Sequence, residues 1–168
     1  MILTRRSMIL ATGSAFALSA CGDGGSGFPT YDGPPVTGVV AWKARRQLVL
    51  MNEAQILRQY HFELGFTPAG HKQFEGDGRT PEGTYWVDRK NPRSSYHLSV
   101  GVSYPNQQDR EYALSQGRRP GGDIFIHGTP RAKQNQPDWT AGCIAVANAE
   151  IEEIYAMVGV GTPIVILP

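Results

Sequence analysis

Residues 123–146 read DIFIHGTPRAKQNQPDWTAGCIAV and carry His127 and Cys143 near their two ends. A thiol and an imidazole are the two side chains that most readily form a nucleophile and base pair near neutral pH. Residues 123–126, of which the last three are apolar, predict a short strand that places His127 at its end. The small residues 140–142 predict a turn that presents Cys143. This stretch therefore predicts both a piece of β-sheet and a reactive site.

The two glycines beside these residues are also candidates for the site. Gly142 lets backbone N–H groups approach a substrate carbonyl closely, so the peptide groups near Gly142 and Cys143 are expected to hold an oxyanion. A third group usually orients the base, and no Asp or Asn stands out for this role. The Gly128 carbonyl is therefore expected to accept the second N–H of the His127 ring. Pro130, Pro137 and Trp139 predict that the intervening loop is stiff.

A zinc site made from Cys143 and the four histidines is the competing chemistry. The sequence contains no Cys-x-x-Cys, no His-Glu-x-x-His and no compact pair of ligands. The spacing argues against a metal, and no cofactor is expected. A structural, inert Cys143 and a Cys21–Cys143 disulfide are the remaining alternatives for the thiol, although Cys21 precedes a Gly-rich segment.

Composition predicts one compact, β-rich domain. The 168 residues are 40% apolar and include 20 Gly and 12 Pro, so they can form a real core with many turns. The net charge is +1; without Arg5 and Arg6 the 16 basic residues become 14, against 15 acidic ones. This balance indicates neither nucleic acid nor a polybasic membrane surface as a partner, and a monomer is expected.

Residues 1–20 have a basic start, an apolar run and small residues before Cys21, as in a secretory signal peptide. Arg5 and Arg6 are compatible with a twin-arginine signal or with an ordinary export signal. The sequence Leu18-Ser19-Ala20-Cys21 is similar to a bacterial lipobox, in which Cys21 is lipidated; the alternative is a soluble exported protein cut near Ala20. We expect a periplasmic lipoprotein with a flexible tether over 21–37, rich in Gly between 22 and 33, and a folded domain over 38–168.

Periodicity predicts a mainly β domain with two short helices. The expected helices are 106–116, with Asn106 as N-cap, and 148–158, with Asn148 as N-cap. A turn-rich loop over 65–83 is expected to leave His71 exposed. The expected strands are 36–42, 47–51, 59–64, 96–104 and 163–167, with a further strand starting at 84–88. Alternation over 96–104 places Tyr96 on an apolar face and His97 on a polar face that could line the site.

Three motifs together resemble the catalytic domain of the L,D-transpeptidases (YkuD type), which are bacterial cell-wall enzymes. They are Gly78-Arg79-Thr80-Pro81-Glu82-Gly83, Ile126-His127-Gly128 and Thr140-Ala141-Gly142-Cys143-Ile144, and the ending Gly161–Val165 is also similar. The resemblance covers about 39–168 and implies an L,D-transpeptidase-like β-sandwich or barrel.

The resemblance implies that Cys143 is the nucleophile and His127 the general base. Such enzymes attack the amide after the third residue of a peptidoglycan stem peptide and pass the acyl group to an amine or to water. It further implies that Thr140 braces the turn next to the substrate and that Tyr96 and His97 line the cleft.

Two departures from the family pattern affect these expectations. Many members have an Arg shortly after the Cys, whereas this chain has Ala145, so Arg79 or Arg131 is the expected anchor for a substrate carboxylate. The connection 128–139 is also shorter than in many members. Crosslinking, hydrolysis by an L,D-carboxypeptidase or endopeptidase, and a non-catalytic wall-binding lipoprotein therefore remain alternative functions.

Overall fold

The structure is a computed structural model that describes residues 29–168. The predicted signal peptide, Cys21 and residues 22–28 of the predicted tether lie outside the described residues. The elements in chain order are β1 (Gly38–Trp42), β2 (Gln47–Asn52), β3 (Gln55–His61), β4 (Gly83–Ser94), β5 (His97–Val102), α1 (Gln107–Ser115), β6 (Ile124–His127), the 3-10 helix η1 (Arg131–Lys133), β7 (Ile144–Ala145), α2 (Asn148–Met157) and β8 (Pro163–Leu167). No helix among residues 29–168 is long and apolar enough to span a membrane.

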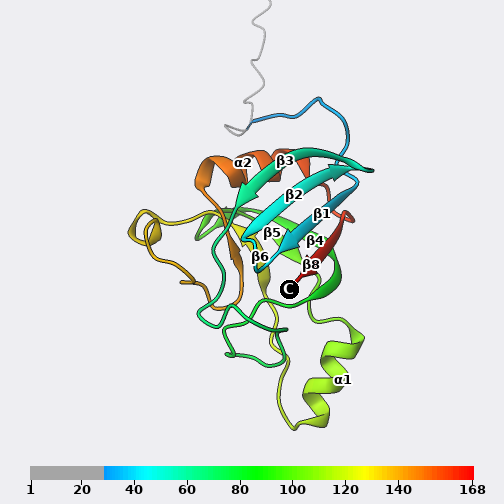
Figure 1. Cartoon of the computed structure of the whole chain (residues 1–168), viewed down its shortest axis with the longest axis vertical. Helices are drawn as coiled ribbons and strands as arrows, with labels where there is room; N and C mark the ends of the chain where they lie inside the picture. The colour runs from blue at the N-terminus through cyan, green and yellow to red at the C-terminus, as the bar shows by residue number, and fades with distance from the viewer. Residues whose placement is uncertain (1–28) are drawn as a thin grey trace, which may run out of the picture.

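The strands form one curled sheet in the order β3-β2-β1-β8-β4-β5-β6-β7 (Figure 1). The long strand β4 pairs first with β8 and then with β5, so it links the two halves of the sheet. Just after β3, Glu63 exchanges two backbone hydrogen bonds with Ala145 of β7, at 2.8 and 2.9 Å. Chain segments at the two edges of the sheet therefore meet, which leaves little unpaired edge. The predicted mainly β fold with two short helices is confirmed.

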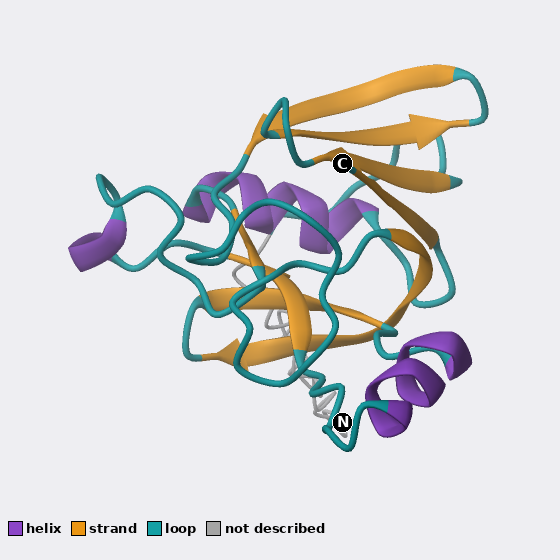
Figure 2. Cartoon of the chain, turned by 60° about the horizontal axis from the view of Figure 1, so that its bottom comes forward, coloured by secondary structure: helices purple, strands orange, loops and turns teal. Residues whose placement is uncertain are grey.

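Helix α2 lies between the two halves of the sheet (Figure 2). Its apolar side chains Ile151, Ile154 and Met157 are buried in the common core. The Tyr60 hydroxyl of β3 donates to Glu153 at 3.0 Å. The prediction that Asn148 caps this helix is wrong, because the N-cap is Ala147. Asn148 instead accepts a hydrogen bond from Thr129 N–H at 2.9 Å, and this contact ties the helix to the loop after β6.

Helix α1 begins at the predicted cap and projects from the sheet (Figure 1). The Asn106 side chain accepts from Asp109 N–H at 3.0 Å, and Asp109 accepts from Asn106 N–H at 2.9 Å. These reciprocal bonds satisfy two N–H groups that the first helical turn leaves without partners.

Two predicted strands differ from those observed. The strand expected over 59–64 begins earlier, at Gln55, because a tight turn with Glu53 in a left-handed conformation follows β2 directly. Strand β5 begins at His97, so Tyr96 lies outside it and is 41% exposed rather than in the core. Before β1, Tyr31 and Val36 pack against the core, and the Thr37 N–H donates to the Met51 carbonyl at 2.7 Å.

Gly65 marks the point where three backbone segments meet. A Cβ atom on Gly65 would lie 2.1 Å from the Gly78 carbonyl oxygen and 2.7 Å from the Gly142 nitrogen. None of these backbone atoms can move aside without disturbing a hydrogen-bonded segment, so any side chain here overpacks the junction.

We therefore predict that Gly65→Ala lowers the free energy of unfolding by about 1–3 kcal/mol, as overpacked cores do. The matched control is Gly38→Ala, because a Cβ on Gly38 meets no atom within 4 Å. The control should change stability by less than about 0.5 kcal/mol. Urea denaturation measures both, and equal stability of the two variants would contradict the predicted junction.

Candidate active site

Strand β6 places His127 at its last position, where the imidazole is buried and only 3% exposed. The ring Nδ1 lies 2.8 Å from the Gly128 carbonyl oxygen. A carbonyl only accepts, so Nδ1 carries the proton and Nε2 keeps a free lone pair. The contact that we expected between Gly128 and the ring is thus present, and it fixes the tautomer that a general base needs.

Two aromatic side chains enclose the imidazole. The ring of Tyr96 stacks on it with centroids 4.5 Å apart, and the ring of Trp139 meets it edge-on at 5.6 Å. Burial lowers the pKa of His127, and the hydrogen bond to Gly128 offsets only part of this effect. The imidazole is therefore neutral at neutral pH. Trp139 also has a buried indole N–H with no hydrogen-bond partner in the described part of the chain.

Parallel pairing brings Cys143 to the same sheet surface as His127. Strands β6 and β7 pair Ile126 with Ile144 and His127 with Ala145. Cys143 therefore lies one strand across and two residues along from His127, and alternation places both side chains on the face opposite Ile126. Cys143 is a partly exposed free thiol. Its Sγ donates to the Asp123 carbonyl at 3.5 Å, and no hydrogen bond joins it to His127 within residues 29–168.

The thiol is held in its protonated form. Burial raises the pKa of Cys143, and the backbone N–H of Phe125 offsets this only in part. With the pKa of His127 lowered and that of Cys143 raised, the resting pair is a neutral thiol and a neutral imidazole. Such a pair can transfer a proton when a substrate arrives, but it does not hold a standing ion pair.

The turn before Cys143 is braced from inside by Thr140. The Thr140 hydroxyl donates to the Cys143 carbonyl at 2.8 Å and accepts from Gly142 N–H at 3.1 Å. Because Thr140 is 4% exposed, its hydroxyl serves the turn and does not face solvent. Gly142 has a φ of +127°, and a Cβ there would lie 2.5 Å from the Arg79 carbonyl oxygen.

This bracing alters the predicted oxyanion site. The Gly142 N–H is used within the turn, contrary to our expectation that it would face a substrate oxygen. The N–H of Cys143 has no acceptor among the described residues. The Cys143 peptide nitrogen is therefore the backbone donor available next to the sulfur, and Thr80 holds the turn by donating from its hydroxyl to the Gly142 carbonyl at 2.8 Å.

Other predicted residues lie elsewhere. His97 has a left-handed backbone with a φ of +72°, and its Nε2 lies 2.6 Å from Glu152 of α2. Arg79 contributes its backbone carbonyl to the Gly142 turn, whereas its guanidinium lies beside Gly70. Arg131 is exposed on η1. Ala145 is 1% exposed and hydrogen-bonded to Glu63, so this position presents no group to a substrate.

An ion pair that the sequence did not indicate positions the aromatic loop. Arg46, in the turn after β1, makes a bidentate contact with the Asp138 carboxylate. Its Nη2 donates to Asp138 Oδ2 at 2.8 Å, and its Nη1 donates to Oδ1. This bond lowers the pKa of Asp138 below its usual range. Asp138 N–H also donates to Glu63 at 3.1 Å. Trp139 follows directly, so the pair fixes its approach to His127. The partners are far apart in sequence, and no local pattern links them.

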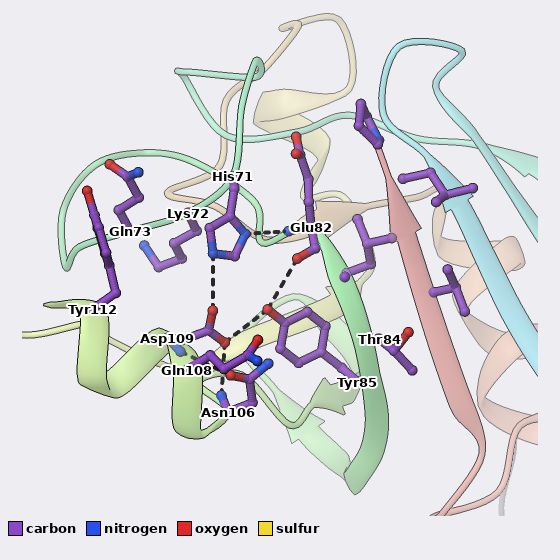
Figure 3. A pocket seen from close by; sticks show the side chains of 15 residues that line it. His71, Lys72, Gln73, Glu82, Thr84, Tyr85, Asn106, Gln108, Asp109 and Tyr112 are labelled. Atoms are coloured by element: carbon purple, nitrogen blue, oxygen red, sulfur yellow. Dashed lines mark hydrogen bonds and ion pairs between the residues drawn. The ribbon is translucent and has the colours of Figure 1, made fainter.

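A cavity of about 790 Å3 lies away from the thiol, between α1, β4 and β8 (Figure 3). His71 lines it and is not freely exposed as predicted. Its Nδ1 accepts from Glu82 N–H at 2.9 Å, and its Nε2 lies 3.1 Å from Asp109. Tyr85 donates to the same carboxylate at 3.0 Å. These contacts tie the 65–83 loop to α1 and thereby support the segment that contacts Gly142. Among the described residues no group of three His, Cys, Asp or Glu side chains could hold a metal.

Comparison with known proteins shows similarity over most of the chain. Residues 37–166 match the family described as the L,D-transpeptidase catalytic domain (YkuD). A protein of Escherichia coli K12 named "Putative L,D-transpeptidase YafK" is 33% identical over 91 residues, which cover 53% of this chain and 32% of that protein. The chain thus spans about a third of this relative's length.

Solved structures agree with this match. The helical cell shape determining protein Pgp2 of Campylobacter jejuni is 28% identical, with a TM-score of 0.62 over 78% of this chain and 47% of that one. Bd1075 of Bdellovibrio bacteriovorus, 24% identical, has a TM-score of 0.57 over 79% of this chain and 48% of its own, and shows the fold alone. Since the family match covers most of the described domain, the chain belongs to the L,D-transpeptidase catalytic-domain (YkuD) family.

Proposed function

We propose that this domain is a cysteine acyltransferase that acts on peptidoglycan stem peptides, with Cys143 as nucleophile and His127 as general base. The observation that carries the proposal is a neutral, buried imidazole with a fixed tautomer, on the same sheet surface as a partly exposed thiol. Membership of the L,D-transpeptidase family supports the substrate class.

Acylation begins when the thiol turns from the Asp123 carbonyl toward His127. Nε2 takes the thiol proton as the sulfur attacks the carbonyl carbon of the third residue of the stem. The carbonyl oxygen becomes an oxyanion, to which the Cys143 N–H donates. The C–N bond then breaks, and the imidazolium returns the proton to the nitrogen of the departing D-residue. A thioester and a free amine result.

Deacylation runs through the same groups in reverse. An incoming amine or water gives a proton to Nε2 and attacks the thioester carbon, and the sulfur leaves and regains that proton. The intact pair of Cys143 and His127 favours catalysis over a purely binding role. Transpeptidation and hydrolysis share the acylation step and differ in the acceptor, which the products of the reaction identify.

For location, we propose that the protein is exported and anchored at the membrane through a lipid on Cys21. Support comes from the sequence of residues 1–21, whose basic start, apolar run and Leu18-Ser19-Ala20-Cys21 ending fit a lipoprotein signal. The substrate class fits this location, because peptidoglycan lies outside the cytoplasmic membrane.

Cys143→Ala is predicted to abolish processing of purified muropeptides, because no other thiol lies in the described domain. Mass spectrometry of the products measures this: the wild-type protein should release the terminal D-residue, with dimers marking an amine acceptor and trimmed monomers marking water. The circular dichroism spectrum of the variant should match that of the wild type. Continued processing by Cys143→Ala would refute the nucleophile.

His127→Gln is predicted to slow alkylation of Cys143 by iodoacetamide at pH 7, because the thiol is protonated there and loses its base. The raised pKa of the thiol means that the wild-type rate rises with pH. Above that pKa the thiolate forms without help, so the two rates should converge. Intact mass measured over time gives both rates. Equal rates at pH 7 would show that the two side chains do not exchange a proton.

Cys21→Ser is predicted to release the full-length protein from the membrane fraction, since a hydroxyl cannot form the thioether to the lipid. Fractionation and immunoblotting of cells expressing either form measure the distribution. If the variant stays in the membrane fraction, the lipid anchor at Cys21 is wrong.

A further inference from the structure

An arginine that the sequence did not indicate crosses the sheet surface toward the nucleophile. Arg89 lies in β4, where the pairing with β5 shifts register. Its side chain passes over Gly101, since a Cβ there would lie 2.7 Å from Arg89 Cγ. The guanidinium carbon then lies 4.6 Å from the centroid of the Phe125 ring. A larger residue at 101 would block this path, so the glycine allows Arg89 to reach β6.

Strand register places this guanidinium on the same face as the catalytic pair. Gly101 pairs with Phe125, and the parallel register of β6 and β7 continues from Ile126–Ile144 back to Phe125 and Cys143. Phe125, like His127, points away from the core side of β6. Neighbouring strands are about 4.8 Å apart, so the guanidinium lies on the order of 10 Å from the sulfur, or about three residues of extended peptide.

A cavity lies beside Arg89 and is bounded by Asp123, the residue that contacts the thiol. Its volume is about 540 Å3, and its walls include Arg89, Arg119, Glu75 and Asp123. Asp123 links the cavity to the nucleophile, because its carbonyl oxygen accepts the hydrogen bond of the Cys143 thiol at 3.5 Å. A ligand in this cavity therefore contacts the residue whose carbonyl holds the Cys143 thiol.

Each cationic group of this cavity is paired with a carboxylate that solvent reaches. Arg89 donates to Asp88 at 2.7 Å and to Asp123 at 2.9 Å. The Asp123 side chain is 89% exposed, and such exposed pairs contribute little, so a ligand carboxylate can replace it. Phe125 shields one face of the guanidinium from water and favours a planar, two-pronged ligand. Arg119, which also lines the cavity, pairs with Glu75, and both are exposed.

We propose that this cavity is a carboxylate subsite beside Cys143 and that Arg89 binds a free carboxylate of the substrate, within about three residues of the attacked carbonyl. The ligand class is a peptide with a free carboxylate near the scissile amide; the identification with a stem peptide rests on the proposed function. Arg89 thereby supplies a charge that the buried Ala145 does not present.

The test compares two maleimides that differ only in a terminal carboxylate: N-propylmaleimide and N-(2-carboxyethyl)maleimide. The ratio of their rates of addition to Cys143 in the full chain reports the local charge. Taking the ratio cancels any change in the intrinsic reactivity of the thiol, because both reagents react with the same sulfur. Arg89→Gln should lower the ratio of acidic to neutral reagent about tenfold, within the range of a charge-assisted hydrogen bond. Arg89→Lys should restore part of the lost preference for the acidic reagent, because lysine keeps the positive charge.

Arg45→Gln is the matched control, because it removes the same charge from an exposed position in the turn between β1 and β2. Its ratio should equal that of the wild type. An Arg89→Gln ratio equal to that of Arg45→Gln overturns the subsite. In that case processing of muropeptides by the wild type still supports the proposed function. If the ratio falls but the wild type processes no muropeptide, the subsite stands and the proposed function fails.

A second measurement uses the substrate. For the wild type, amidating the carboxylate that Arg89 binds should raise KM for the stem peptide. For Arg89→Gln, the free and amidated peptides should have the same KM. If amidation still raises KM in Arg89→Gln, another residue binds the carboxylate. That result would overturn the role of Arg89.

Discussion

The two backbone hydrogen bonds between Glu63 and Ala145 hold the structure together beside the candidate active site. They join the segment after β3 to β7 and so close the curled sheet. Cys143 lies two residues before this junction. The Thr140 hydroxyl, the Thr80 hydroxyl and the close approach of Gly65 all fix the same few residues. Cys143 therefore follows a turn that contacts from several parts of the chain hold in place.

Burial determines the chemical state of the pair. Enclosing His127 between Tyr96 and Trp139 removes water from the ring, which disfavours its charged form. The same effect disfavours the thiolate of Cys143. Both groups thus rest uncharged, and a proton transfer from the thiol to the imidazole would have to separate charge in a site that is poor in water. A site of this kind spares the thiol from indiscriminate oxidation, because the thiolate is the reactive form.

Contacts between neighbours in sequence could be predicted, and contacts between distant residues could not. The Gly128 carbonyl was identified as the partner of His127 because the two residues are adjacent, and the Asn106 cap followed from a local pattern. The Arg46–Asp138 pair and the path of Arg89 over Gly101 depend on strand order, which no periodicity reveals. Asn148 was misassigned because its amide binds Thr129, a tertiary contact that outweighs a capping preference.

The central position of β8 in the sheet affects the order in which the strands can pair. This strand comes last in the described chain, yet it lies between β1 and β4 and pairs with both. During synthesis, the two halves of the sheet therefore have no common strand until residues 163–167 emerge. Non-local pairing of this kind is slow, because a long loop must close before the contacts form. The two halves of the sheet, and with them the segments around His127 and Cys143, are therefore joined through a shared strand only when β8 has paired with both β1 and β4.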